Sequence, residues 1–594
     1  MTKFVQPVSE NIWNLKYRHK TFDGVNLDDS VEDTWARISE QLAFAEKEQG
    51  RVWRKEDFYE VLEDFKFIPA GRIISGSGTN RNVTLVNCFT MGTIPDSLVG
   101  IFDHLKEAVL TMQQGGGIGY DFSTLRPKGA HVKGVDADSS GPLSFMDVWD
   151  SMCRTIMSAG SRRGAMMATM RCDHPDIEDF IKAKRTEGRM RMFNLSVMCS
   201  DRFLNAVKND LDWDLHFEGK VYKTLKAKHL WQTIMLSTYE YAEPGVLFID
   251  RINDMNNTYY YDTIATTNPC GEKCMGPYSS CVLGSINLPA FVVQPFFDRA
   301  RLDYAQLQNC VKNAVRMLDN VIDVTKYPLQ NQKDKSISER QIGLGVTGVG
   351  SMLIMMKMTY GSDQAVQFME ELMKFINDTA YNESVELAIE KGSFPLFDAD
   401  KFLDSGFMKT RSELLRSKVR KYGIRNSLLT SIAPTGTISL YANNVSSGIE
   451  PVFALYYERK VLNNDGSHTK ELVMDYAVYL WRKLFGAEPL PDYFVTAQTL
   501  SPIDHIRMQS AVQKHVDSAI SKTTNCPEDI SFEDFQSVYL MAYDMGCKGC
   551  TTYRPNEVLG SVLTVIPEPV ATTVPNQMGA CAYDSNTGVR TCES

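Results

Sequence analysis

The stretch TTNPCGEKCMGPYSSCVLGSINL, residues 266–288, places a turn-rich loop directly before a strand-like apolar run. An Asn-Pro pair favours an extended or turn backbone before Cys270, and Gly271 allows a sharp reversal after it. Because side chains alternate along an extended segment, Asn268, Cys270 and Glu272 can point to one face. A carboxylate beside a thiol raises the thiol pKa, so the loop suits hydrogen-atom chemistry at a neutral thiol better than thiolate attack. The alternative is a cysteine in a Pro-Gly turn beside a solvated glutamate.

Short apolar runs alternate with helical patterns on both sides of this loop. The strand candidates are VTLVNCFTMG (83–92), FNLSVMCS (193–200), GVLFID (245–250), SINLPAFVV (285–293), QIGLGVTG (341–348) and RNSLLTSIAP (425–434). The helix candidates are DHLKEAVLTMQQ (103–114), LSFMDVWDSMCRTIMSA (143–159), YAQLQNCVKNAVRMLDNVIDVT (304–325) and DQAVQFMEELMKFINDTAYNESVELAIEKG (363–392). This alternation predicts an α/β fold with a largely parallel sheet or barrel.

The two ends of the chain differ from this pattern. An N-terminal helical region over residues 1–86 is expected, because apolar residues recur at helical spacing from Val31 to Leu42. Residues 87–563 are expected to form the main α/β domain. From Pro567 onward the sequence is rich in Pro, Thr, Val, Asn and Gly, which predicts a flexible tail over residues 564–594.

The composition is that of an ordinary globular protein of 594 residues, with 43% hydrophobic and 23% charged residues. A net charge of −10 is unlike that of a nucleic-acid-binding tail, so a nucleotide site needs local arginines and backbone N–H groups. No stretch approaches the ~20 apolar residues of a membrane span, and the N-terminal MTKFVQPVSENIW has no apolar signal core. We therefore expect a cytoplasmic protein with no membrane and no direct nucleic-acid binding.

Thirteen cysteines in a chain without a secretion signal argue against a structural disulfide framework. Five lie in helical or strand-like contexts that are typical of packing, namely Cys153, Cys172, Cys199, Cys310 and Cys526. Five others stand beside Gly, Pro or Asn, or in the tail, namely Cys88, Cys270, Cys281, Cys581 and Cys592. None of these spacings resembles a zinc site, so no metal is expected.

Cys547 and Cys550 form a CxxC pair that can bind metal or exchange disulfides. Metal binding needs two further ligands, and none lies close in the sequence, so burial of Cys550 as a packing residue competes with both functions. A thiol-disulfide oxidoreductase that uses this pair is the alternative from a different class. Its activity would be independent of nucleotides and would survive replacement of Cys270.

The segment APTGTIS, residues 433–439, follows the strand-like SLLTSI. A strand followed by a Thr/Gly turn with free backbone N–H groups is a natural phosphate cradle, especially if Thr435 or Thr437 begins a helix. An ordinary helix cap is the alternative. The triple glycine at 115–117 lacks the spacing of a dinucleotide fingerprint or a P-loop and is a weak signal by itself.

These segments closely resemble those of the ribonucleotide reductases. The matching motifs are NPCGE, CxLGSINL, the Asn-Cys strand, QQGGGIGYDFSTLRP (113–127), SAGSRRGAMM (158–167), RQIGLGVTG (340–348), APTGTIS, SGIEP (447–451) and KGCTTYR (548–554). They follow the family's order from about residue 10 to residue 563. The resemblance is strongest to the adenosylcobalamin-dependent members, class II.

The resemblance implies a ten-stranded α/β barrel with a finger loop at its centre and Cys270 at the tip of that loop. Cys270 would carry the thiyl radical that abstracts the ribose 3′-hydrogen, Glu272 would take the 3′-hydroxyl proton, and Asn268 would hold the ribose hydroxyls. Cys88 and Cys281 would be the reducing pair on the opposite ribose face, ending as a disulfide. The products would be 2′-deoxyribonucleotides for DNA synthesis, made from diphosphates in preference to triphosphates.

The resemblance also implies binding sites, partners and a homodimer. The ribonucleotide substrate would contact Asn87, Gly117, Pro434, Thr435, Gly436, Thr437, Ile438 and Ser439. A dNTP or ATP effector would contact Asp96, Ser97, Arg126, Ser161, Arg162 and Arg163, although Arg163 also suits a plain surface position. Cys581 and Cys592 would re-reduce the active-site pair and exchange with a thioredoxin- or glutaredoxin-type reductant. Their spacing departs from the tighter pairs of the family.

The radical source is inferred from a further comparison with the family. Members that receive the radical from a ferritin-like, metal-containing partner subunit resemble one another in two adjacent tyrosines, where this chain has Thr552-Tyr553. A glycyl-radical member would show an Arg-x-x-Gly-Tyr-like setting near the C-terminus, which we do not find. Adenosylcobalamin is therefore the expected cofactor, with the partner subunit as the alternative.

Two further expectations follow from the order of the motifs. The first catalytic cysteine stands at residue 88, which leaves no room before it for the family's regulatory ATP-binding domain. Overall on/off control by dATP is therefore not expected. A catalytically inactive nucleotide-binding regulator is disfavoured, because the five predicted catalytic residues are all present.

Overall fold

The structure, a computed structural model, describes residues 3–48, 50–52, 54–132, 136–156, 164–186, 188–462, 468–555, 564–565, 581–583 and 590–592. Its central strands form two parallel halves. The first half comprises β2 (Cys88–Thr90), β3 (Gly117–Asp121), β6 (Met166–Arg171), β7 (Phe193–Cys199) and β10 (Gly245–Phe248), each parallel to the next.

The second half begins with β11 (Ser280–Asn287) and β14 (Ile342–Thr347), which are parallel. Leu344 then bridges in parallel to Thr430, and Ile432 bridges in parallel to Ile520, so two extended segments continue the sheet. The second segment leads into β17 (Thr523–Asn525), which is parallel to β18 (Gly549–Tyr553).

The two halves meet in antiparallel pairs, β2 with β11 and β10 with β18. Five segments in each half therefore close a ring of ten, and the expected ten-stranded α/β barrel is confirmed. β1 (Phe67–Pro69) pairs with the later residues of β11. Every residue of β11 and β14 is buried, as parallel strands covered on both faces require.

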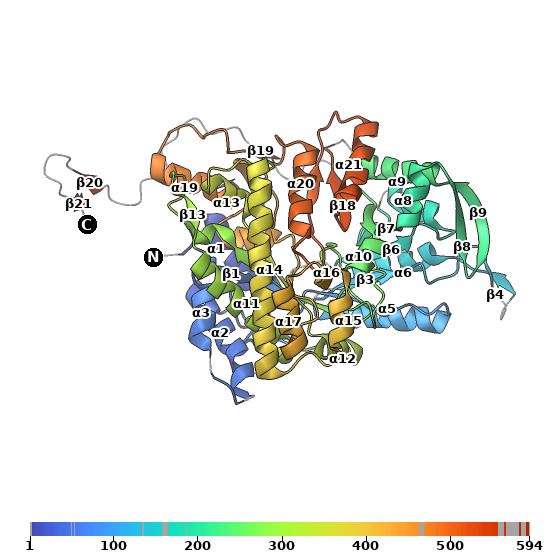
Figure 1. The fold of residues 1–594 in the computed structure, drawn as a ribbon, viewed down its shortest axis with the longest axis horizontal. Coiled ribbons are helices and arrows are strands. Elements are labelled where there is room, and N and C mark those ends of the chain that lie inside the picture. The colour runs from blue at the N-terminus through green and yellow to red at the C-terminus, as the bar shows by residue number, and fades with distance from the viewer. Residues whose placement is uncertain are drawn as a thin grey trace.

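Helices and short ladders surround this ring (Figure 1). Following the first-half strands are α5 (Leu98–Gln113), β4 (His131–Val132), β5 (Ala137–Asp138), α6 (Pro142–Thr155), α7 (Ile177–Lys182), α8 (Asp201–Lys208), β8 (Asp212–Phe217), β9 (Lys220–Lys226), α9 (Ala227–Tyr241) and α10 (Ile249–Asp254). Following β11 are β12 (Val292–Val293), β13 (Arg301–Leu302), α11 (Tyr304–Val324), α12 (Gln330–Glu339), α13 (Val349–Met355), α14 (Asp363–Lys391), α15 (Ala399–Asp404), α16 (Gly406–Lys409), α17 (Glu413–Tyr422) and α18 (Gly436–Tyr441). The remainder comprises β15 (Tyr456–Leu462), β16 (His468–Met474), α19 (Tyr476–Phe485), α20 (Pro502–Gln513), α21 (Phe532–Asp544), β19 (Thr564–Val565), β20 (Cys581–Tyr583) and β21 (Arg590–Cys592).

Two strand predictions need correction. The run SINLPAFVV is not one strand, because β11 ends at Asn287 and Pro289 lies in a 3-10 turn over Leu288–Phe291. The run RNSLLTSIAP is extended but pairs only through isolated bridges. Proline lacks the N–H that a ladder needs, which explains the first break.

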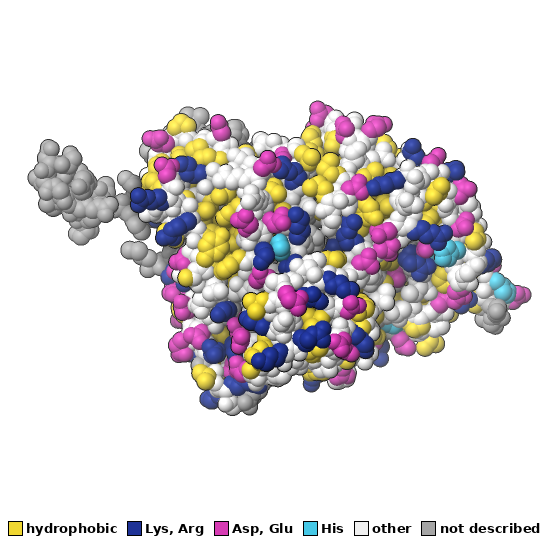
Figure 2. Space-filling model, viewed as in Figure 1, with side chains coloured by type: hydrophobic (Ala, Val, Ile, Leu, Met, Phe, Trp, Pro, Cys, Tyr) yellow, Lys and Arg dark blue, Asp and Glu magenta, His cyan; other side chains and the backbone are white. Residues whose placement is uncertain are grey.

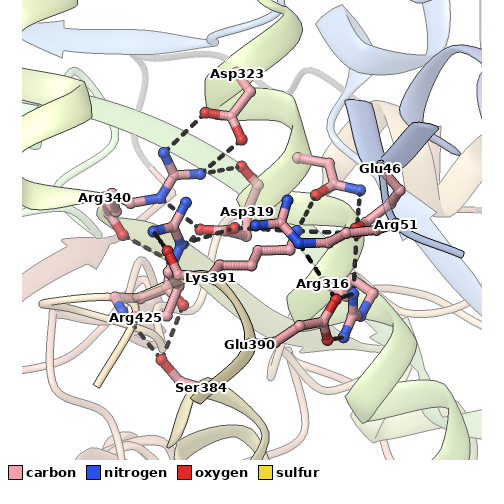
Figure 3. Close-up of polar contacts among 12 residues, drawn as sticks. Glu46, Arg51, Arg316, Asp319, Asp323, Arg340, Ser384, Glu390, Lys391 and Arg425 are labelled. Carbon is pink, nitrogen blue, oxygen red and sulfur yellow. Dashed lines mark hydrogen bonds and ion pairs between the residues drawn. The ribbon is translucent and has the colours of Figure 1, made fainter. Parts of the chain in front are cut away.

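The expected N-terminal helical region is confirmed, with α1 (Pro7–Ile12), α2 (Val31–Glu48), α3 (Lys55–Leu62) and α4 (Gly71–Gly76). A buried ion-pair network joins α2 to helices of the barrel (Figure 3). Glu46 of α2 accepts hydrogen bonds from Arg316 at 3.1 Å and from Lys391 at 2.9 Å. Asp319 accepts a hydrogen bond from Arg340 at 2.8 Å. Burial by itself would raise the pKa of Asp319, but the surrounding cations outweigh it and hold that pKa below its usual range.

Charged side chains of both signs are interspersed over the face of the molecule in Figure 2. Such mixing differs from the positive stripe that is typical of nucleic-acid-binding surfaces. Among the helices that the structure describes, none combines the length and the apolar character needed to cross a membrane.

Candidate active site

The finger loop, residues 266–274, is closed by its own hydrogen bonds. The Asn268 side-chain oxygen accepts from the Lys273 N–H at 3.0 Å, and the Asn268 carbonyl accepts from the Gly271 N–H at 3.0 Å. Gly271 has a φ of +81°, a left-handed conformation that glycine adopts at little cost. The resulting reversal leaves Cys270 exposed at the tip.

Both halves of the barrel hold the finger loop. From the first half, Asn194 of β7 donates to the Pro269 carbonyl oxygen at 2.7 Å. From the second half, the Glu272 carbonyl oxygen accepts from the Ser431 hydroxyl at 2.8 Å and from the Ala519 N–H at 2.9 Å. The loop therefore crosses the interior of the ring, where strands of both halves fix its backbone.

Glycines of β3 allow the finger loop to approach the sheet. A Cβ added at Gly119 would lie 1.9 Å from the Thr267 carbonyl oxygen, so a larger residue would force the loop away. A Cβ at Gly117 would lie 3.1 Å from the Pro269 Cγ and 3.2 Å from the Cys88 sulfur. Gly117, a predicted substrate contact, thus lies between the loop and Cys88.

Cys88 and Cys281 stand directly opposite each other in the antiparallel pair of β2 and β11. Opposite residues in such a pair have Cα atoms about 4.5–5.5 Å apart, within the roughly 4.4–6.8 Å that a disulfide spans. Neither residue forms a disulfide in this structure. Burial raises the pKa of the Cys281 thiol well above its usual value, and the nearby Glu272 carboxylate adds to the shift. The two thiols can therefore exchange electrons as a pair with little backbone movement.

Glu272 is buried and carries unsatisfied polar atoms. Within the described residues, neither its Oε2 nor the Nδ2 of Asn268 has a hydrogen-bond partner. Burial raises the pKa of Glu272 to about 7, against the opposing effect of the neighbouring Asn268 amide. A buried donor or acceptor left unpaired costs about 1–3 kcal/mol, so a ligand hydroxyl that pairs with these atoms is favoured.

The predicted phosphate loop begins α18, with Thr435 as the preceding residue in a left-handed conformation at φ 54°. The Thr435 hydroxyl does not cap the helix, which argues against the ordinary-cap alternative. It accepts from the Gly448 N–H at 2.7 Å and pairs with the Thr347 hydroxyl at 2.8 Å. A Cβ at Gly436 would meet open space, so the first turn of α18 is accessible.

The other predicted substrate contacts lie on or beside these elements. Ile438 and Ser439 are buried within α18, whereas Pro434 and Thr437 are partly exposed. The carbonyl oxygen of Asn87, the residue before Cys88, accepts from the Gly117 N–H at 2.8 Å.

The predicted effector residues at the start of α5 come together. Arg126 donates from its Nε to the Asp96 carboxylate at 2.7 Å and from its backbone N–H to the same carboxylate at 3.2 Å. Ser97 caps α5 by accepting from the Gly100 N–H at 3.1 Å. The other three predicted contacts, Ser161, Arg162 and Arg163, lie outside the described residues.

The four remaining cysteines of interest divide into two kinds. Cys581 and Cys592 are opposite positions in the register of the β20–β21 ladder. Cys547 and Cys550 are buried, and burial raises the pKa of Cys547 to about 12. A buried thiol with so high a pKa is a poor nucleophile, so the CxxC pair matches packing better than disulfide exchange. No cluster of three or more metal-ligating side chains occurs in the described ranges.

Several residues that hold the site escaped sequence reasoning. Asn194 was hidden inside an apolar strand candidate, where a single polar residue was the available signal. Lys273 is fully buried beside Glu272 and donates to the Ile342 carbonyl and to the Ser518 hydroxyl, each at 2.9 Å. Nothing in its spacing predicts this contact, which depends on strands far along the chain.

Comparison with known proteins agrees with this geometry. The family described as "Ribonucleotide reductase, barrel domain" matches residues 86–553, and "Ribonucleotide reductase, all-alpha domain" matches residues 3–82. A vitamin B12-dependent ribonucleoside-diphosphate reductase of Thermoplasma acidophilum is 35% identical over 581 residues, covering 94% of this chain and 72% of the relative. A protein of the same name from Mycobacterium tuberculosis (strain CDC 1551 / Oshkosh) is 35% identical over 557 residues, covering 90% and 76%. The ribonucleoside-diphosphate reductase subunit alpha of Chlamydia pneumoniae is 28% identical over 597 residues, covering 87% and 56%.

Proposed function

Because this chain belongs to the ribonucleotide reductase family, we propose that it reduces ribonucleoside diphosphates to 2′-deoxyribonucleotides, with adenosylcobalamin as the source of the radical. The observation that carries the proposal is the position of Cys88 opposite Cys281, with the finger loop packed against Cys88 through Gly117. A radical thiol and a separate dithiol are the two components that this reduction requires. The relatives named as vitamin B12-dependent support the choice of cofactor.

The reaction uses the geometry as follows. The cofactor, when bound, supplies the radical that removes the hydrogen atom from the Cys270 thiol. The Cys270 thiyl takes the ribose 3′-hydrogen, while Glu272 accepts the 3′-hydroxyl proton. Cys88 and Cys281 together give two electrons and two protons, so the 2′-hydroxyl leaves as water, hydrogen takes its place, and a disulfide forms. Return of the 3′-hydrogen restores the Cys270 thiyl.

The fit to the cofactor rests on the exposure of Cys270 in a loop whose other functional side chains are buried. An exposed thiol can be approached by a large corrin, and Cys270 is the residue that the cofactor would meet. The alternative is a radical supplied by a metal-containing partner subunit. At the position where that relay needs a second tyrosine, Thr552 is buried and its hydroxyl pairs with the Tyr539 hydroxyl at 2.9 Å.

A homodimer through α5 and α6 is part of the proposal. Several apolar side chains of these two helices are exposed, namely Leu98, Val99, Phe102, Leu110 and Val148. Exposed apolar residues gathered on neighbouring elements are typical of protein interfaces. The Asp96–Arg126 pair lies at the start of α5, so an effector bound there would contact the same interface.

The tail cysteines are expected to recycle the active-site pair. The Cys581→Ser/Cys592→Ser variant should complete about one turnover per prereduced chain and then stop with a thioredoxin-type protein reductant, because one dithiol supplies two electrons. Product counts after rapid mixing would measure this. Sustained turnover of the double variant with the protein reductant would show that the tail is only a linker.

Loss of the Arg126 side chain should weaken effector control. A charge-assisted contact to a triphosphate is worth about 1.5–3 kcal/mol, so Arg126→Ala should lower effector affinity roughly ten- to a hundred-fold. Effector-dependent choice among substrates should fade while basal reduction persists. Substrate competition assays with and without dNTP would test this, and an unchanged effector response would place the effector site elsewhere.

A further inference from the structure

A cationic cavity of about 930 Å³ opens between the N-terminal segment and α4. Its lining includes Lys16, Lys20, Arg72 and Arg81, and none of the residues that line it is acidic. This contrasts with the net charge of −10 for the whole chain. The cavity thus concentrates positive charge in an acidic protein, which favours an anionic occupant.

Apolar side chains share the lining of this cationic cavity. Leu15, Phe22 and Leu27 belong to it, with exposed fractions of 41%, 103% and 53%. Large exposed apolar groups beside cations suit a peptide that is both apolar and acidic. They suit a bare phosphate less well, since a phosphate offers nothing to the apolar part.

One wall of the cationic cavity leads to the redox pair. The guanidinium of Arg72 lies against Gly115, where an added Cβ would be 2.4 Å from the Arg72 Cζ. Gly115 is two residues from Gly117, where an added Cβ would be 3.2 Å from the Cys88 sulfur. Asn82, another lining residue, lies in the segment that runs into β2. The lining residue Arg72 and the Cys88 sulfur therefore contact two glycines of one short segment, residues 115–117.

Another lining residue, Tyr17, is connected by a series of contacts to β19, at the start of the C-terminal tail. Tyr17, in the lining, packs its ring on Tyr441 of α18 with centroids 5.1 Å apart. Just beyond α18, Asn444 accepts a hydrogen bond from the Tyr457 hydroxyl at 2.9 Å. Tyr457 of β15 pairs with Val565 of β19, which comprises the first two residues of the tail. Contacts among the described residues thus connect the cavity lining to the strand from which residues 566–594 continue.

The part of the tail that follows β19, residues 566–594, has the composition and the length to reach the cationic cavity. It contains Glu568, Asp584 and Glu593 against a single basic residue, Arg590, and so carries a net charge of −2. Cys581 lies sixteen positions after Val565, and an extended chain spans at most ~3.3–3.6 Å per residue, or roughly 55 Å here. That reach is about twice the ~25 Å radius of gyration of a compact chain of this size.

We propose that the cationic cavity is the seat of the C-terminal tail while its cysteines reduce the Cys88–Cys281 disulfide. The inference rests on the proposed function of the tail as a redox shuttle. A tail thiolate attacks one sulfur of the disulfide and releases the other as a thiolate, which takes a proton. The second tail cysteine then attacks the mixed disulfide between the first tail cysteine and the barrel cysteine. This leaves Cys88 and Cys281 as thiols and joins Cys581 and Cys592 in a disulfide. A dithiol reductant from outside restores the tail.

The test counts products made by prereduced enzyme with bound adenosylcobalamin and no reductant in solution. A wild-type chain holds two dithiols and should make about two products, the second only through the tail. The seat variant Lys20→Glu/Arg81→Glu should make the first product at the wild-type rate and the second about ten-fold more slowly or worse. The matched control Lys220→Glu/Lys228→Glu reverses two charges in β9 and α9, outside the lining of the cavity, and should behave as wild type.

Each outcome decides a different point. A seat variant that makes both products at the wild-type rate would overturn the proposal that the tail binds in the cationic cavity. A seat variant that slows the first product and raises the KM for nucleotide would also overturn it, and would identify the cavity as a nucleotide site. Two products from the Cys581→Ser/Cys592→Ser variant would contradict the shuttle itself, which is a separate failure. Selective loss of the second product in the seat variant supports the proposal.

Discussion

Cys270→Ser should bind nucleotides normally and yet form deoxyribonucleotides only at background level. The hydroxyl of serine cannot replace a thiol in hydrogen-atom transfer, and the loop backbone that holds this position is fixed by Asn194, Ser431 and Ala519 rather than by the sulfur. Removing a group that carries a covalent or radical step typically costs about 10⁴-fold or more in kcat. Anaerobic turnover and equilibrium nucleotide binding, measured on the same preparation, would separate chemistry from binding.

The matched control for this variant is Cys153→Ala, which changes a buried cysteine of α6 outside the site. This variant should retain activity and bind nucleotides as the wild type does, because the buried Cys153 side chain contributes only to packing. Appreciable deoxyribonucleotide formation by Cys270→Ser would remove Cys270 from the mechanism.

Glu272→Gln should lower turnover by about 10²–10⁴-fold, the usual contribution of a positioned general base. In the wild-type enzyme the carboxylate must be ionised to accept the 3′-hydroxyl proton, and burial raises its pKa to about 7. Activity should therefore rise with pH through about 7, and this limb should be absent in the variant. A pH profile of kcat for both proteins, with saturating substrate, would test the assignment.

The same pKa shift also predicts how the stability of the folded protein changes with pH, which provides an independent check. The folded-state pKa of Glu272 lies above its ordinary value of 4.5, so folding favours the protonated form. As pH rises from 4.5 through about 7 and beyond, the wild type must hold a buried charge and loses stability relative to Glu272→Gln. Denaturation at pH 4 and pH 8 should show that the free energy of unfolding of Glu272→Gln, relative to that of the wild type, is higher at pH 8 than at pH 4. A wild-type kcat that does not change with pH through about 7 would contradict the assignment of Glu272 as the base.

Local patterns predicted the long helices and the loop reversal, since these depend on residues close in sequence. The 3.6-residue spacing marks α11 and α14, and Asn-Pro with Gly271 marks the finger loop. The pairing of Cys88 with Cys281 could not come from spacing, because 193 residues separate them and only the antiparallel junction of the two half-barrels brings them together. Resemblance to the family supplied that pair.

Contacts between distant segments explain what sequence reasoning missed. Asn194 and Ser431 hold the finger loop from opposite halves of the barrel, and neither position is unusual within its own segment. The cationic cavity is likewise assembled from residues 15–27 and 71–83, whose basic side chains are scattered along the chain. Such sites arise from topology, which local periodicity does not encode.

Anaerobic turnover of CDP by the purified single chain, with adenosylcobalamin, a dNTP effector and dithiothreitol, tests the central claim most directly. The predicted result is dCDP formation that depends on adenosylcobalamin and survives, in large part, the substitution Tyr553→Phe. Cys270 is exposed, so a bound cofactor would reach it directly and no tyrosine relay would be needed. The contradicting result is a chain that stays inert with adenosylcobalamin and becomes active only when a ferritin-like metalloprotein is added.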